Sequence, residues 1–201
     1  ASLDYGGTWK AMHYQARRFF APETIVAIPS GDRGEIALSM INDGADTAGF
    51  KVEVVTVDLD GRSHPLMQLE GQCPTDRAAE IGRIDASSVP DGHLLVWSWT
   101  VTNGGAGRGH HVMSTYKVLD LKPSGLALHE AKSEDGQRLL TLSATGLALF
   151  VMVEADCPGR FSDNAFDLFA GESRTISFMP DDPDAAPRFT LRDLHSCQAT
   201  E

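Results

Sequence analysis

The chain has 201 residues, 42% of them hydrophobic, with a formal net charge of −11. This length allows one or two globular domains with ordinary cores, and the acidic excess argues against nucleic acid or an anionic membrane surface as a main partner, because both require clustered Lys and Arg. The sequence also has no apolar run of the roughly 18 residues that a membrane span needs, and its first residues lack the features of a signal peptide.

The first residues predict a single helix. Thr8 follows two glycines and is a suitable N-cap, and Pro22 ends the pattern. Apolar side chains recur between them at helical spacing and form one stripe, made of Trp9, Met12, Ala16 and Phe19 or Phe20. Charged residues occupy the other face, so the stripe requires an apolar partner. We expect that partner to be a preceding domain, which makes this segment a domain interface.

From residue 23 onward the periodicity changes to two, which predicts strands. The first set covers residues 24–28, 34–41, 50–59, 65–68, 94–102 and 111–119. Within residues 50–59 the apolar phase shifts by one residue, which indicates a β-bulge near Val54. Gly61 and the run from Asn103 to Gly105 supply turn residues that tolerate positive φ, so antiparallel hairpins are expected. The set is typical of a seven-stranded immunoglobulin-like sandwich in which one strand is not yet assigned.

A second set of strands follows Pro123 and Gly125, which mark a domain boundary. It covers residues 126–131, 138–143, 147–155, 165–169, 174–178 and 187–194. The strand at 147–155 is apolar on both faces, so Phe150 and Met152 are predicted to face another domain. The expected fold is mainly β, with a helix at 1–22, one sandwich at 23–121 and a second sandwich at 122–201; a single larger sandwich is the alternative.

Two segments carry a family resemblance. The run LDYGGTWKAMHYQARRFFAP at residues 3–22 resembles the end of the catalytic barrel in β-mannosidases of glycoside hydrolase family two. The run FSDNAFDLFAGE at residues 161–172, about 140 residues downstream, is similar to a motif in the last β-sandwich of those enzymes. Ala170 departs from the family, which usually has proline there. The resemblance implies that residues 1–22 are the terminal helix of a (β/α)8 barrel and that both sandwiches are immunoglobulin-like accessory domains.

The resemblance also implies a retaining exo-β-mannosidase that releases terminal β-D-mannose. Such an enzyme needs two carboxyl groups about 5 to 5.5 Å apart, and both family motifs that supply them are expected upstream of Ala1. This chain is therefore predicted to hold no catalytic residue, and its partners are expected to be its own catalytic barrel and, through it, a mannoside. Asp4 and Tyr5 precede the helix at the expected mouth of that barrel, which gives them a weak substrate-binding prediction.

The remaining acidic side chains are interpreted as structural. Glu134 lies in a turn sequence, and the others are expected to be solvated acids of strands or turns. These others are Glu53, Asp58, Asp167 and Glu172.

No cofactor and no metal are expected. The three cysteines lack metal-ligand spacing and allow at most one disulfide, which Cys157 and Cys197 could form if the last strand runs beside that loop; reduced thiols are expected. Asp163 and Asn164 offer too few oxygens for calcium, which takes about six to eight ligands, so backbone hydrogen bonding in an Asx-type turn is predicted for them. The sequence does not indicate the cellular compartment of the protein.

A free-standing carbohydrate-binding or interaction module is the second hypothesis for function. Trp97 and Trp99 share one strand face, and exposed indoles there could stack on sugar rings. The alternation of the neighbouring residues favours burial of both rings in the core. Exposure of this tryptophan face is the feature that distinguishes the two hypotheses.

Overall fold

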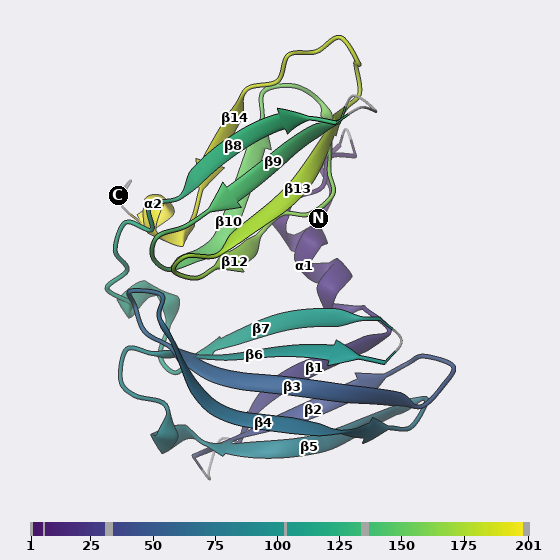
Figure 1. Ribbon diagram of the computed structural model, residues 1–201, viewed down its shortest axis with the longest axis vertical. Helices are drawn as coiled ribbons and strands as arrows, with labels where there is room; N and C mark the ends of the chain where they lie inside the picture. Colours follow the sequence, from purple (N-terminus) through teal and green to yellow (C-terminus); the bar gives the residue numbers. More distant parts are fainter. Residues whose placement is uncertain (1, 6, 31–33, 103, 134–136, 199–201) are drawn as a thin grey trace. The chain divides into compact units, whose positions relative to one another are not determined.

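A computed structural model describes residues 2–5, 7–30, 34–102, 104–133 and 137–198 of the chain. The predicted mainly β fold with sandwich architecture is confirmed: the strands form antiparallel sheets in two compact units (Figure 1). The amino-terminal sandwich consists of Arg18–Asp58 and Ser63–Asp120. The carboxyl-terminal unit consists of Ala1–Arg17, Leu59–Arg62 and Leu121–Glu201. None of the helices in the described ranges is long and apolar enough to cross a membrane.

The amino-terminal sandwich packs a three-stranded sheet, in the order β1-β2-β5, against a four-stranded sheet, in the order β4-β3-β6-β7. Its strands are β1 (Glu23–Ser30), β2 (Glu35–Asn42), β3 (Ala48–Val57), β4 (Ser63–Cys73), β5 (Arg77–Asp85), β6 (Leu94–Val101) and β7 (Ala106–Val112). Alternation builds the core, since Ile36, Leu38 and Met40 on β2 are buried while the residues between them are half-exposed. The bulge prediction is confirmed, because the register of β3 against β4 shifts between Val54 and Val55.

Two strand predictions in this sandwich were incomplete. The unassigned strand is β5, which pairs with β2 and has few of the β-branched residues that mark a strand. The predicted strand at 111–119 is wrong over most of its length: β7 ends at Val112, and a short 3-10 turn, η2 (Tyr116–Val118), follows. Strand β7 instead begins at Ala106 and includes Gly107 and Gly109. Glycine has no side chain, so these positions gave no hydrophobic pattern in the sequence.

These two glycines make room for the tryptophans of β6. Trp99 lies opposite Gly107 and Trp97 opposite Gly109 in the ladder, and a Cβ atom on either glycine would overlap the indole ring of its partner. The Trp97 indole N–H donates a 2.9 Å hydrogen bond to the Ile25 carbonyl on β1, in the opposite sheet. Trp97 is therefore a core group that joins the two sheets, and Trp99 is half-buried against the same core. Strand β7 is glycine-rich because these two rings cover it.

Replacing Gly107 with alanine is expected to lower the free energy of unfolding of this sandwich by about 1 to 3 kcal/mol, because the new methyl group overpacks the site. Chemical denaturation of the two proteins measures the difference. Combining the change with Trp99→Phe removes the ring atoms that the methyl group meets, so the double variant should recover part of the loss. Additive losses in the double variant would contradict this account of β7.

The sandwich of the carboxyl-terminal unit has sheets in the orders β12-β10-β14 and β11-β13-β9-β8. Its strands are β8 (Ala127–Lys132), β9 (Arg138–Ser143), β10 (Ala148–Ala155), β11 (Gly159–Phe161), β12 (Phe166–Leu168), β13 (Ser173–Pro180) and β14 (Phe189–Arg192). The core centres on Phe178, whose ring lies 4.6 Å from that of Phe161 and 5.4 Å from that of Phe189, centroid to centroid. Strand β11 was not predicted, and Glu134 lies outside the described residues.

A second helix at the end of the chain corrects the expectation of strands alone after the leading helix. Helix α2 (Leu194–Gln198) follows β14, where the sequence predicted a continuous strand over 187–194. Asp193 begins this helix, because its Oδ1 accepts the Ser196 backbone N–H at 2.8 Å. Helix α2 packs on β10. This packing accounts for part of the apolar outer side of β10, since Leu149 is 1% exposed yet lies outside the sandwich core.

The turn Leu59–Arg62, between β3 and β4, belongs to the carboxyl-terminal unit. The Gly61 carbonyl accepts a 3.1 Å hydrogen bond from the Ala170 backbone N–H, and Lys122 forms a 2.7 Å ion pair with Asp60. Gly61 has φ +84°, and a Cβ atom there would crowd the backbone of Leu147 and Ala170. Only glycine meets both requirements at this position.

Candidate functional site

The segment before the first helix is a tight loop held by its own hydrogen bonds. The Asp4 carboxylate accepts the Thr8 backbone N–H at 2.8 Å, and the backbones of Leu3 and Trp9 form an isolated bridge. Asp4 is thus engaged within the loop. Tyr5 projects from it and is fully exposed. The pair stays a weak substrate-binding prediction.

Helix α1 (Ala11–Phe19) begins later than the sequence indicated. Thr8 is therefore not its N-cap, and Trp9 precedes the helix rather than heading its apolar stripe. The helical side chain that this chain buries is Tyr14, at 2% exposed, which the sequence pattern did not single out. The predicted interface residues Met12, Phe19 and Phe20 are 62%, 62% and 85% exposed. These three remain predicted interface residues.

Trp9 contacts two guanidinium groups of the carboxyl-terminal unit. The Cζ atom of Arg160 lies 5.1 Å from the ring centroid and that of Arg17 lies 5.9 Å from it. Both distances are within the range of cation–π attraction. The rings of His13 and Tyr14 lie 4.2 and 5.3 Å away. Other side chains of this chain therefore cover part of Trp9, which is half-buried.

Asp163 is a buried carboxylate between two arginines. It is 7% exposed, and it pairs with Arg174 of β13 at 2.5 Å and with Arg17 of α1 at 3.4 Å. Its Oδ1 also accepts the Asn164 backbone N–H at 2.9 Å. Arg174 in turn lies over the Phe166 ring, at 4.7 Å. The charge of this carboxylate is thus compensated on two sides, which a buried ion requires.

Asn164 joins two strands through its side chain. The amide oxygen accepts backbone N–H groups of Val153 at 2.9 Å and Ala165 at 3.0 Å, and the amide nitrogen donates to the Val153 carbonyl at 2.8 Å. Asn164 is 3% exposed. The two side chains therefore bond to backbone, as predicted, but Asn164 does so mainly across to Val153 rather than in an Asx-type turn. Ala165 follows with φ +54°, a left-handed conformation that these bonds hold in place.

Phe150 and Met152 are half-buried on β10. Phe150 has φ +53° beside the register shift of β10 against β12, and its backbone N–H donates to the Asp167 carboxylate at 3.0 Å. Glu172 likewise accepts the Phe169 backbone N–H, at 3.0 Å. Asp167 and Glu172 are thus structural, as expected. The domain-interface role of Phe150 and Met152 stays a prediction.

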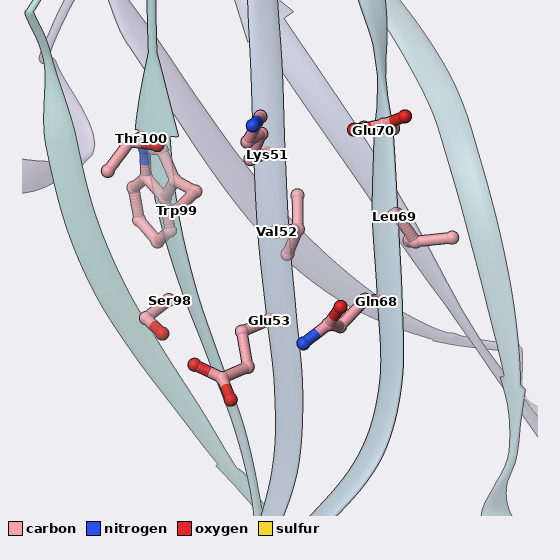
Figure 2. Close-up of a pocket in the computed structure, with 9 residues that line it drawn as sticks. All are labelled: Lys51, Val52, Glu53, Gln68, Leu69, Glu70, Ser98, Trp99 and Thr100. Atoms are coloured by element: carbon pink, nitrogen blue, oxygen red, sulfur yellow. The ribbon is translucent and has the colours of Figure 1, made fainter.

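A polar groove of about 640 Å³ lies on the sheet β4-β3-β6-β7 (Figure 2). Lys51 and Glu53 alternate along β3 with buried valines, so they lie on the side of the sheet away from the core. Figure 2 shows the Gln68 amide extending from β4 toward β3. The aromatic residue of the groove lining is Trp99, which packs against the core. The groove therefore offers polar groups, without the exposed indole face that sugar stacking requires.

No group of three His, Cys, Asp or Glu residues within the described ranges is arranged to hold a metal ion. The side chains that the structure brings together are those of the helix and of the loop at 161–165. Sequence reasoning missed the contribution of Tyr14, Gln15, Arg17 and Arg174, because no local pattern connects them.

Comparison with known proteins gives a match for the carboxyl-terminal sandwich. Residues 121–197 match the Ig_mannosidase family, an Ig-fold domain. The carboxyl-terminal sandwich is therefore similar to the Ig-fold domain of that family, and residues 121–197 are called the mannosidase Ig domain below. This mannosidase Ig domain contains the whole FSDN segment at residues 161–164, and thus both Asp163 and Asn164.

The resemblance to β-mannosidases is confirmed over nearly the whole chain. β-Mannosidase A of Aspergillus oryzae is 26% identical over 89% of this chain and 21% of its own length. β-Mannosidase of Capra hircus is 29% identical over 90% of this chain and 22% of its own length. The chain thus spans about a fifth of the curated relatives that it matches, and the matched region is their carboxyl-terminal part.

Solved structures show the same fold. The β-D-mannosidase of Dictyoglomus thermophilum superposes with a TM-score of 0.79 at 14% identity, over 96% of this chain and 24% of that one. The exo-chitosanase of Amycolatopsis orientalis gives a TM-score of 0.67 at 17% identity, over 96% of this chain and 28% of that one. Both similarities are similarities of fold.

Proposed function

We propose that the chain is the carboxyl-terminal accessory part of a retaining exo-β-mannosidase that hydrolyses terminal non-reducing β-D-mannose residues. The observation that carries the proposal is the match to β-mannosidases over 89 to 90% of this chain but only 21 to 22% of their length. The chain itself is structural and performs no chemistry.

The acidic side chains of the mannosidase Ig domain support this division of labour. A retaining glycosidase needs two carboxyl groups about 5 to 5.5 Å apart, one of them free to protonate the leaving group. In this domain Asp163 is held by two arginines, and Asp167 and Glu172 accept backbone N–H groups. These carboxylates form interactions that stabilise the fold, and a catalytic role would disrupt those interactions. The catalytic pair is assigned to a barrel upstream of Ala1.

The exposed side chains of the first segment suit contact with that barrel. Met12, Phe19 and Phe20 are large, apolar and more than half exposed, and such groups together mark interaction sites. In this proposal helix α1 is the last helix of the barrel, and the three side chains pack against the rest of that barrel. Asp4 and Tyr5 then lie at the mouth of the barrel, where Tyr5 can contact substrate.

The proposal is tested with a chromogenic β-mannoside. The 201-residue chain should give no turnover above background, whereas the longer protein that contains it should release mannose with retention, followed by NMR of the freshly released sugar. Turnover by the chain alone would overturn its non-catalytic role. A longer protein without β-mannosidase activity would overturn the parentage.

The sugar-binding alternative loses its distinguishing feature, since Trp97 is 6% exposed and faces the core. Titration of the chain with manno-oligosaccharides at millimolar concentration should give no saturable signal. Saturable binding that disappears on Lys51→Ala or Glu53→Ala would restore the alternative and place the site in the polar groove.

A further inference from the structure

The two segments that resemble β-mannosidases meet in space, although about 140 residues separate them in sequence. Side chains of helix α1 join it to the loop at 161–165. The Gln15 amide donates to the Ala165 carbonyl at 2.6 Å, Arg17 pairs with Asp163, and the adjacent Tyr14 is 2% exposed. We name this set of contacts the helix clasp.

The helix has little stability of its own. It has nine residues, and isolated helices shorter than about 12 to 15 residues are marginal in water. Its position therefore depends on tertiary contacts. Tyr14 supplies the apolar contact, and its burial is deep enough to raise the pKa of its hydroxyl above the ordinary value.

Asp163 is the charged centre of the clasp. Its side chain is 10% exposed and is shared between the helix and β13, through Arg17 and Arg174. The side chains of its partners Arg17 and Arg174 are 49% and 45% exposed, so these pairs are buried on the carboxylate side. The pair of Glu154 and Arg192 in the same domain has side chains 49% and 56% exposed, and solvent screens it. Loss of Asp163 leaves a guanidinium without its buried counter-ion, whereas loss of Glu154 costs little.

The clasp also fixes the loop before the helix. Trp9 is bridged to Leu3 within that loop, and its ring lies against Arg160 of the Ig domain and Arg17 of the helix. Loop, helix and Ig domain thus form one connected set of contacts around Asp163. The exposed Tyr5 projects from the loop.

We infer that Asp163 is a positioning residue of the enzyme: it clasps the helix that ends the barrel to the Ig domain and so fixes the loop that carries Asp4 and Tyr5. The inference rests on the proposed function for its catalytic part. The mechanical part concerns this chain alone.

The mechanical part is tested by hydrogen exchange of the 201-residue chain. Asp163→Asn removes the negative charge but keeps a side-chain oxygen that can accept the Asn164 N–H. Arg17→Met removes the positively charged partner of Asp163 on helix α1. Both should speed exchange of the amides of α1 about threefold to tenfold, while β8 and β9 keep their rates. The double variant should match Asp163→Asn alone, because Asp163→Asn already removes the interaction with Arg17. Glu154→Gln is the control and should leave α1 unchanged.

The outcomes separate clearly. Unchanged exchange in α1 for both variants overturns the clasp, and so does an equal acceleration in β8 and β9, which would mean general destabilisation. If Asp163→Asn fails to fold, Arg17→Met decides alone, because it leaves the Asp163–Arg174 pair in place.

The catalytic part is tested in the longer protein at a temperature well below its Tm. Asp163→Asn should lower kcat/KM for a β-mannoside about threefold to tenfold relative to Glu154→Gln, and Asp163→Glu should restore part of it. Equal kcat/KM in the Asn and Gln variants overturns the positioning role. A parent without β-mannosidase activity overturns the proposed function instead, and the exchange result on helix α1 then stands by itself.

Discussion

Trp97→Ala is expected to lower the free energy of unfolding of the amino-terminal sandwich by about 3 to 5 kcal/mol, the range for removing a large aromatic side chain from a core. Two losses combine. The indole fills the space between the sheets over Gly109, and its N–H satisfies the buried Ile25 carbonyl. Urea denaturation followed by circular dichroism measures the change.

Trp97→Phe separates these two losses. It keeps most of the apolar volume but leaves the Ile25 carbonyl without its donor, so a smaller loss of about 1 to 3 kcal/mol is expected. Thr100→Ala, on the exposed face of the same strand, should change stability by no more than about 0.5 kcal/mol. A Trp97→Ala chain as stable as the parent would contradict the core assignment and reopen the sugar-platform interpretation.

Asn164→Ala is expected to destabilise the mannosidase Ig domain by about 2 to 4 kcal/mol, because it deletes three hydrogen bonds to buried backbone. Both polar groups of Val153 lose their partner in the middle of β10. The positive φ of Ala165 also loses the bond that holds it. Differential scanning calorimetry should show a lower Tm for the Ig domain.

Ser162→Ala is the matched control. The Ser162 hydroxyl oxygen accepts one backbone N–H, from Ser177 at 2.9 Å, and the bond is exposed. Its loss should cost less than about 1 kcal/mol, because water replaces the missing partner. Equal losses for Ser162→Ala and Asn164→Ala would mean that the buried amide has no special role.

The sequence predicted elements best where periodicity was strong. The strand at 138–143 and the bulge near Val54 agree with the structure, because strict alternation and its single phase shift are local signals. Strand β5 was missed because Arg, Ala and Gly replace β-branched residues along it. Helix α2 has five residues, too short for a helical period to register.

The site was only half accessible from sequence. The resemblance selected both segments of the helix clasp, yet it gave no sign that they touch, because residue contacts between segments this far apart have no periodic signature. The sequence predicted an apolar stripe that includes Met12 and Phe19, and both side chains are exposed in this chain. Tyr14 was not, since its burial depends on a loop about 150 residues away. Charge pairs such as Asp163 with Arg17 become visible only after folding.

The hydrogen bond between the turn at Leu59–Arg62 and Ala170 limits how the two segments can be exchanged between related proteins. The resemblance to β-mannosidases predicts proline at position 170, but this chain has Ala170, whose backbone N–H donates to the Gly61 carbonyl. Proline has no N–H, so a relative with proline there must hold this turn by other means. A chimaera that takes residues 121–197 from a relative with proline at position 170 would therefore lose the hydrogen bond to the Gly61 carbonyl.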